Sequence, residues 1–240
     1  MIKRELYMNR IRPFIGGELI KVMTGIRRSG KSVMLELIKE ELAEAGVAPS
    51  QMISINFEDM RYSHLQTATA LHDEIIKRAE GIEGKAYLFF DEIQEVEGWE
   101  KCVNSLRVAL DCDIYITGSN AKLLSGELAT YIGGRYVEFV IYPFSFAEFL
   151  ELYHTIAPSD SIQQCFQKYL LAGGMPYLAN LRYEEEPSRQ YLTDLFNSVQ
   201  LKDIVKRNKI RDIDLLERII AYMTANVGTV FSCLLYTSDA

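Results

Sequence analysis

The chain has 240 residues, a formal net charge of −7, 48% hydrophobic residues and 25% charged residues. This balance is ordinary for a globular protein, and the length allows one large domain or a domain with a smaller appendage. The acidic excess argues against non-specific nucleic-acid binding over the whole surface, although it leaves room for a local basic patch.

Neither a targeting segment nor a membrane segment is evident in the sequence. The start, MIKR, lacks an apolar stretch of signal-peptide length, and no run approaches membrane-spanning length. The four cysteines show neither C-x-x-C spacing nor nearby histidines, which indicates free thiols in a reducing compartment. We therefore expect a cytoplasmic protein without membrane contact.

Strand and helix signals alternate over the first 142 residues, which predicts an α/β fold with a mainly parallel, doubly wound sheet. Short apolar runs predict five strands, at 19–24, 52–57, 86–90, 113–117 and 136–141. Helical spacing predicts the intervening helices, at 31–45, 72–80 and 99–110. From Pro143 onward only helices are predicted, at 145–153, 162–171, 188–207 and 212–225.

Residues 25–32, GIRRSGKS, fit G-x-x-x-x-G-K-[ST], the loop that wraps its backbone amides around the phosphates of a nucleoside triphosphate. The predicted strand before it and helix after it supply the required context, because a helix N-terminus directs unpaired N–H groups at an anion. Lys31 would neutralise the β and γ phosphates, and Ser32 would supply a hydroxyl to Mg²⁺. The residues expected to bind the nucleotide are Gly25, Ser29, Gly30, Lys31 and Ser32.

The predicted strand at 86–90 runs directly into Asp91 and Glu92. A carboxylate after a buried strand emerges at the carboxyl edge of the sheet, where open α/β sheets bind ligands. We expect Asp91 to hold Mg²⁺ through water, and Glu92 to orient and polarise the attacking water. This pair suits water activation better than phosphate transfer to a small molecule.

The predicted strand at 113–117 is followed by Gly118, Ser119 and Asn120. A polar side chain at the strand tip can sense the γ-phosphate or help to place the water. The alternative role is that of a helix N-cap, for which Ser and Asn are also favoured, and the two residues could divide the two roles between them. Either Ser119 or Asn120 suits the sensing role, and the sequence does not choose between them.

Five segments together resemble the prokaryotic AAA-type ATPases that carry a C-terminal domain of uncharacterised function: GIRRSGKS, LFFDEIQ, TGSNAKLLSGEL, GGR and YPFSFAEFL. The resemblance covers about residues 1–230. It implies an AAA+-like core with an extra strand between the phosphate loop and the Asp-Glu strand, as in additional-strand ATPases with a catalytic glutamate. We assign 1–142 to this core, 143–185 to a helical lid and 186–232 to the start of a winged-helix-like region. Because residues 233–240, CLLYTSDA, resemble translated sequencing-adapter read-through, we expect that tail to be non-native.

The resemblance also assigns individual residues. Arg135 holds the place of a candidate arginine finger, which a neighbouring subunit of a homo-oligomer would supply; an ordinary surface ion pair is the alternative. Asn56 holds the place of a polar residue that contacts the catalytic glutamate, here Glu92, and a buried asparagine bonded to backbone is the alternative. Arg27 and Arg28 would either contact phosphate or remain solvated.

We therefore expect an ATPase that uses Mg²⁺ and whose hydrolysis drives or times a conformational change. The alternatives are a nucleotide-loaded switch that turns over rarely and a DNA-associated module acting through the C-terminal region. The basic residues available for the latter are Lys202, Lys206, Arg207, Lys209 and Arg211. Neighbouring aspartates favour a solvated helix face there. Apart from the nucleotide, the sequence names no protein or DNA partner.

Overall fold

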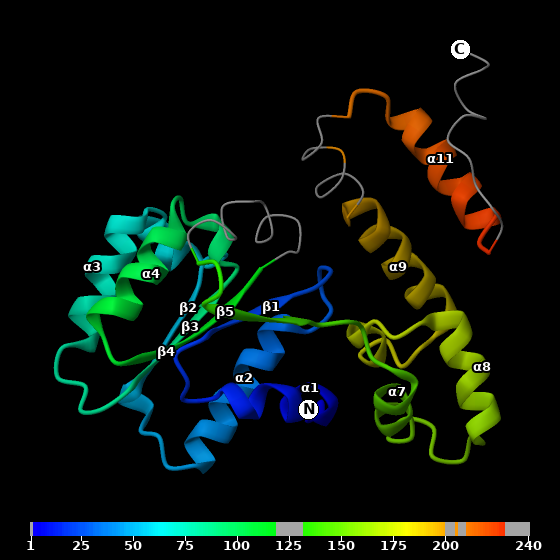
Figure 1. Ribbon diagram of the computed structural model, residues 1–240. Coiled ribbons are helices and arrows are strands. Elements are labelled where there is room, and N and C mark those ends of the chain that lie inside the picture. The colour runs from blue at the N-terminus through cyan, green and yellow to red at the C-terminus, as the bar shows by residue number, and fades with distance from the viewer. Residues whose placement is uncertain (1, 119–131, 200–204, 206–209, 229–240) are drawn as a thin grey trace. The chain divides into compact units, whose positions relative to one another are not determined.

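The computed structural model describes residues 2–118, 132–199, 205 and 210–228. Its contacts divide the chain into two compact units, Met1–Arg189 and Gln190–Ala240. The predicted domain limits at 142, 185 and 232 stay predictions beside this division. Figure 1 shows the elements in chain order.

The first unit is built on a parallel sheet whose strands lie within one residue of the predicted limits. They are β1 (Ile20–Thr24), β2 (Met52–Asn56), β3 (Ala86–Asp91), β4 (Cys112–Thr117) and β5 (Tyr136–Val140). Their order is β2-β3-β4-β1-β5, and every neighbouring pair is parallel. An additional strand, β4, therefore separates the strand before the phosphate loop from the Asp-Glu strand, as the resemblance implied.

Helices cover both faces of this sheet (Figure 1). They are α1 (Glu5–Ile11) and α2 (Lys31–Glu44) on one face, and α3 (Ala68–Ala79) and α4 (Trp99–Ala109) on the other. Strand side chains alternate between the two layers: Met23 packs with α1 and α2, whereas its neighbour Val22 packs with α3 and α4. Burial on both faces explains why β3 is a nearly continuous apolar run, whereas the edge strand β2 alternates between buried and exposed residues.

Three helix starts differ from the sequence prediction by more than one residue, namely those of α1, α3 and α9 (Glu185–Val199), which begins three residues before the predicted 188. Helix α1 was not predicted at all. Helix α3 begins four residues before the predicted 72, because the Thr67 hydroxyl accepts a hydrogen bond from Ala70 N at 3.3 Å and caps the helix.

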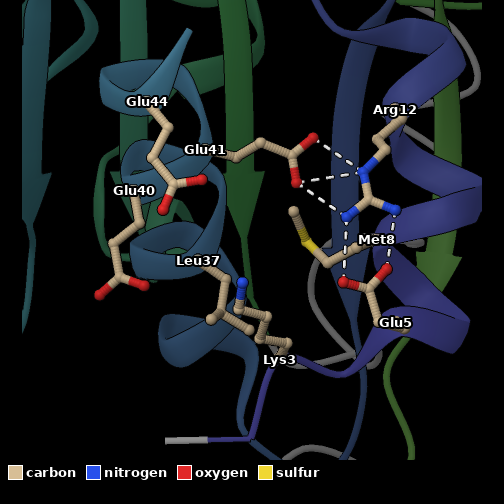
Figure 2. Close-up of a pocket in the computed structure, with 8 residues that line it drawn as sticks. All are labelled: Lys3, Glu5, Met8, Arg12, Leu37, Glu40, Glu41 and Glu44. Atoms are coloured by element: carbon tan, nitrogen blue, oxygen red, sulfur yellow. Dashed lines mark hydrogen bonds and ion pairs between the residues drawn. The ribbon is translucent and has the colours of Figure 1, made fainter.

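Arg12 fastens α1 to α2. Its Nε donates to Glu41 at 2.8 Å and its Nη1 donates to Glu5 at 2.7 Å. Figure 2 shows these contacts at the side of a pocket of about 250 Å³, whose apolar lining is Met8 and Leu37. The pocket lies between the two helices, and its lining includes none of the phosphate-loop residues.

Helices α7 (Phe146–Tyr153) and α8 (Ile162–Ala172) follow the sheet within the first unit, as predicted. They pack through a cluster of aromatic rings: Phe146, Phe149, Tyr153, Phe166, Tyr169 and Tyr183. The turn η5 (Pro176–Ala179) and α9 (Glu185–Val199) come next. Beyond Val199 the predicted helix at 188–207 leaves the described residues, apart from residue 205.

The second unit contains α11 (Ile213–Ala225), which Asp212 caps by accepting a hydrogen bond from Leu215 N at 2.8 Å. This agrees with the predicted helix at 212–225. The predicted non-native tail lies outside the described residues. In the part of the chain that the structure describes, every helix is too short or too polar to cross a membrane.

Candidate functional site

The phosphate loop connects the end of β1 to the start of α2, as the motif predicts. Gly30 occupies the N-cap position of α2 with φ 101°, and Gly25 has φ 148°. A Cβ atom on Gly25 would stand 2.2 Å from the carbonyl oxygen of Ile141, so this position has no room for a side chain. Both glycines of the motif are therefore required by the backbone itself.

Lys31, at the first position of α2, is folded back over its own loop. It is 5% exposed, and its Nζ donates to the carbonyl oxygens of Gly25 and Ile26 at 3.2 Å each. The same Nζ lies 3.8 Å from Glu92 Oε1. The structure thus brings the predicted phosphate-binding cation and the predicted catalytic carboxylate together across the loop.

The two serines of the loop differ in their surroundings. Ser29 is fully buried, and among the described residues its Oγ has no hydrogen-bond partner. That oxygen lies 3.0 Å from where a Cβ on Gly25 would stand. Ser32, in the first turn of α2, is exposed to solvent.

Asp91, the last residue of β3, is held on both carboxylate oxygens. Its Oδ1 accepts a short hydrogen bond from Thr117 Oγ1, and its Oδ2 accepts one from Asn56 Nδ2 at 3.1 Å. One part of the alternative for Asn56 is confirmed, because its Oδ1 accepts a hydrogen bond from the backbone N–H of Glu58 at 2.9 Å, but Asn56 is exposed and not buried. The expected contact with Glu92 was wrong: the side-chain amide donates to Asp91, one residue before Glu92. The reason is the register of the sheet, which pairs Asn56 with Asp91.

Glu92 leaves the strand through a left-handed backbone conformation, with φ 55°. Its N–H donates to Thr117 Oγ1 at 3.0 Å, and its Oε2 accepts a short hydrogen bond from Gln94 Nε2. Its side chain is 17% exposed. This turn directs the carboxylate of Glu92 back toward Lys31 instead of outward along the strand.

Thr117 is a site residue that the sequence reasoning missed. The search for a polar strand tip went to the residues after the strand, Ser119 and Asn120, which lie outside the described residues. Thr117 is the last residue of β4, and the pairing of Phe90 with Ile116 brings the next residues, Asp91 and Thr117, side by side. The signal available in the sequence was a threonine that directly follows the apolar residues 114–116.

Arg135 lies away from the residues above. It stands directly before β5, and its carbonyl oxygen accepts a hydrogen bond from Ile20 N at the start of β1. In a parallel sheet this is the amino edge, opposite to the edge where the phosphate loop begins. Its exposed guanidinium donates to Asn104 Oδ1 at 3.1 Å. Of the basic run considered for DNA, only Arg211 lies within the described residues, and it is exposed.

The residues at the carboxyl edge fit a nucleoside triphosphate with Mg²⁺. The buried Ser29 hydroxyl lacks a partner among the described residues, and the loop backbone at Gly25 excludes a side chain. Among those residues no group of three His, Cys, Asp or Glu side chains gathers as a metal site. A Mg²⁺ ion shared between phosphates, one hydroxyl and one carboxylate does not need such a group, and Ser32 and Asp91 supply these two ligand types.

Known proteins match this chain along most of its length. Residues 18–150 match a family model described as an AAA domain, and residues 163–234 match a domain of unknown function. An uncharacterised protein of Haemophilus influenzae is 40% identical over 229 residues, which is 95% of this chain and 56% of that protein. One from Methanocaldococcus jannaschii is 33% identical over 219 residues, which is 86% of this chain and 47% of that protein. The chain thus spans about half the length of the curated relatives it matches.

Solved structures give weaker likenesses. AMPPCP-bound DnaA from Aquifex aeolicus has a TM-score of 0.47 at 13% identity, covering 99% of this chain and 73% of that chain. A point mutant of RuvB from Thermotoga maritima has a TM-score of 0.47 at 17% identity, covering 94% of this chain and 77% of that chain.

Proposed function

The chain belongs to the family of AAA domains, and on that premise we propose that it binds ATP with Mg²⁺ and hydrolyses it to drive or time a conformational change. The observation that carries the proposal is the approach of Lys31 Nζ to Glu92 Oε1, 3.8 Å apart. A cation for phosphate and a carboxylate for water are the two groups that this hydrolysis needs in one place.

Each side chain has a defined task in this reaction. The loop amides and Lys31 bind the phosphates, for which Lys31 must exchange its carbonyl contacts with Gly25 and Ile26 for phosphate oxygens. Ser32 and Asp91 would hold Mg²⁺, which when bound would neutralise charge that develops on the phosphate oxygens. Thr117 and Asn56 keep the Asp91 carboxylate in place through its two oxygens.

Glu92 is the group that acts on water. Its carboxylate orients the water molecule and accepts a proton as the water oxygen bonds to the γ-phosphorus and the bond to the bridging oxygen breaks. The products are ADP and inorganic phosphate. The left-handed turn at Glu92 supports this role, because functional residues are often held in such sparsely populated conformations.

A slow nucleotide-dependent switch is the second candidate, and the contacts of Glu92 favour it. One carboxylate oxygen accepts from Gln94 and the other faces Lys31. Glu92 must leave these partners before it can accept a proton from water. If that release is rare, ATP stays bound and the protein acts through its nucleotide state instead of through continuous turnover.

The rate of phosphate release from ATP, measured in the presence of Mg²⁺, tests the proposal. Lys31→Ala should abolish ATP binding or turnover, whereas Glu92→Gln should bind ATP and hydrolyse it about 100-fold or more slowly. Lys39→Ala is the matched control, because Lys39 is also on α2 but pairs with Glu36 at 2.7 Å. Unchanged turnover in Glu92→Gln would show that Glu92 does not activate the water. Wild-type turnover below about one ATP per hour, which is on the order of the intrinsic rate of a slow GTPase, would favour the switch.

We propose that Arg135 acts as an arginine finger on the site of a second copy of this chain. Its place at the amino edge of the sheet separates it from its own loop. Specific activity should then rise with protein concentration, and Arg135→Ala mixed with Lys31→Ala should recover activity. Arg78→Ala, which removes a surface arginine paired with Glu74, is the control. Activity independent of concentration would exclude the finger role.

A further inference from the structure

Arg4 is a buried arginine to which the reaction above assigns no task. It stands just before α1, and its guanidinium bonds to two separate parts of the first unit. Nη1 donates to the carbonyl oxygen of Ser29 in the phosphate loop at 3.0 Å. On the other side, Nη2 donates to the carbonyl oxygen of Tyr142 at 2.9 Å, and Nε donates to Glu148 Oε1 at 2.8 Å.

The surroundings of Arg4 hold it in one geometry. It is 2% exposed, and its guanidinium lies over the rings of Tyr7 at 4.6 Å and Phe144 at 5.1 Å from their centroids. Its backbone is left-handed, with φ 47°, a conformation that residues other than glycine adopt at an energetic cost. The backbone at Arg4 is therefore strained in the conformation that brings its guanidinium to the carbonyl oxygen of Ser29.

The carbonyl that Arg4 holds belongs to the same planar peptide as the N–H of Gly30. In a trans peptide the C=O and the N–H point in opposite directions, so a fixed oxygen fixes the direction of that N–H. A hydrogen bond from a charged donor is also stronger than one between neutral groups, and it polarises the peptide that accepts it. Arg4 thus fixes the direction of the Gly30 N–H through the carbonyl oxygen of the same peptide.

Glu148, the carboxylate partner of Arg4, lies on α7. It lies in the first turn of the helix, and its Oε2 also accepts from Ser145 N at 2.8 Å in the N-terminal capping box. Burial acts to raise the pKa of Glu148, but the hydrogen bonds from Arg4 and Ser145 outweigh it and hold the pKa below its ordinary value. The carboxylate is therefore charged at neutral pH and pairs with Arg4.

The connection between β5 and α7 touches the loop a second time. The carbonyl oxygen of Ile141 fills the space beside Gly25, 2.2 Å from where a Cβ would stand. Farther along, Phe144 N donates to Gly174 O at 2.7 Å, and Tyr169 OH donates to Phe144 O at 2.9 Å. The connection therefore lies against the phosphate loop at Gly25 and is hydrogen-bonded to α8 at Tyr169 and to Gly174 just after it.

We propose that Arg4 is a positioning residue that orients the Ser29–Gly30 peptide for phosphate, and that its ion pair with Glu148 couples phosphate binding to the position of α7. The inference deepens the proposed function and rests on it. Because coupling between two sites is reciprocal, anything that displaces α7 should weaken nucleotide binding by the same factor by which nucleotide stabilises α7.

The test compares wild type with Arg4→Lys and Glu148→Gln. Lysine keeps the charge at position 4 but cannot reach the loop and Glu148 at once, and glutamine keeps the shape of Glu148 without its charge. AMPPCP with Mg²⁺ is the probe, its affinity measured by calorimetry and the protection of α7 amides by hydrogen exchange. We expect AMPPCP to slow exchange in α7 of wild type but not in α7 of Arg4→Lys or Glu148→Gln, and we expect Arg4→Lys to bind AMPPCP about tenfold more weakly.

Arg12→Lys is the matched control, because Arg12 also pairs with two carboxylates beside α1, but its hydrogen bonds go to side chains of α1 and α2 and not to the loop. It should keep wild-type affinity and protection. Should Arg4→Lys prove unfolded by circular dichroism, Glu148→Gln carries the test through its loss of α7 protection. Wild-type affinity and protection in both variants overturn the coupling alone, whereas a wild type that binds no AMPPCP overturns the proposed function and the coupling with it.

Discussion

The hydroxyl of Thr117, at the end of β4, donates a hydrogen bond to the carboxylate of Asp91, at the end of β3. The same oxygen accepts from Glu92 N at 3.0 Å. The Thr117 side chain therefore holds the carboxylate of Asp91, which we assign to Mg²⁺. It also holds the backbone turn at Glu92, whose carboxylate we assign to the attacking water. Two neighbouring strands must keep their register for this contact to exist.

Thr117→Val should lower ATP hydrolysis by about tenfold or more while changing ATP affinity much less. Valine has nearly the shape of threonine, so the loss is that of one buried hydroxyl and its two hydrogen bonds, about 1–3 kcal/mol. Steady-state phosphate release gives the rate, and calorimetry with AMPPCP gives the affinity.

Thr117→Ser is the matched control, because it restores the hydroxyl without the methyl group. It should recover most of the rate. A Thr117→Val protein with wild-type turnover would show that Asp91 and Glu92 keep their places without this hydroxyl.

Gly25→Ala should prevent nucleotide binding. The added Cβ would stand 2.2 Å from the Ile141 carbonyl oxygen, and a φ of 148° is unfavourable for alanine. The loop and the connection after β5 must both move, so we expect an ATP affinity lower by at least about 100-fold, or about 2.7 kcal/mol. Equilibrium binding and urea denaturation separate this loss from a general loss of stability.

Gly46→Ala is the control for backbone strain without a clash. Gly46 also has a positive φ, 92°, but a Cβ there would meet nothing within 4 Å. It should cost about 1 kcal/mol of stability and leave ATP binding intact. If both variants bind ATP equally well, the contact with Ile141 is not what shapes the loop.

The sheet was predictable because its strands are short apolar runs between clear turn and helix signals. Runs such as 86–90 are buried on both faces, so composition alone marks them. The boundaries failed where a capping residue, Thr67, started a helix early. Sequence spacing also indicated that Asp91, Glu92 and the phosphate loop would share one sheet edge, because parallel strands end together.

The contacts that depend on register or on distant residues were not predictable. Asn56 contacts Asp91 and not Glu92 because of a pairing that only the folded sheet defines. Arg4 and Glu148 are 144 positions apart, and no local pattern joins them. An arginine near the start of a chain reads as a solvated charge until the fold buries it.

Cys102 and Cys112 should resist alkylation in the folded protein. Burial, with smaller contributions from nearby aspartates, raises the pKa of Cys102 to about 12 and that of Cys112 to about 11. The thiolate is the reactive form, so at pH 9 only about 1% or less of either thiol is reactive. Mass spectrometry after iodoacetamide treatment should find both unmodified in buffer and both modified in urea, with reactivity rising as the pH increases toward the pKa.

Rapid modification of Cys102 in buffer would contradict this expectation. It would mean that α4 opens from the sheet on the timescale of labelling, since Cys102 packs among buried residues of α3, α4 and the strands. Labelling at two reagent concentrations tests whether opening of α4 limits the reaction, because a labelling rate that is limited by opening does not increase with the reagent concentration.

Lys21→Met should destabilise the protein strongly. Lys21 and Asp113 form an ion pair whose side chains are both 0% exposed, at the amino edge of the sheet. Burial lowers the pKa of Lys21 despite the opposing effect of Asp113. Removing the lysine leaves the Asp113 carboxylate buried with, among the described residues, Gly16 N and Tyr115 OH as its remaining donors, at 2.6 and 2.7 Å. We expect the free energy of unfolding in urea to fall by about 3–5 kcal/mol.

The double variant Lys21→Met/Asp113→Asn decides whether the buried charge is the cause. Asparagine keeps an oxygen that can accept from Gly16 N and Tyr115 OH but carries no charge. The double variant should therefore be more stable than Lys21→Met alone, because no unpaired charge remains in the core. If it is instead less stable than Lys21→Met by the full cost of Asp113→Asn, the two substitutions are additive. In that case the loss in Lys21→Met comes from the packing of the lysine side chain and not from its charge.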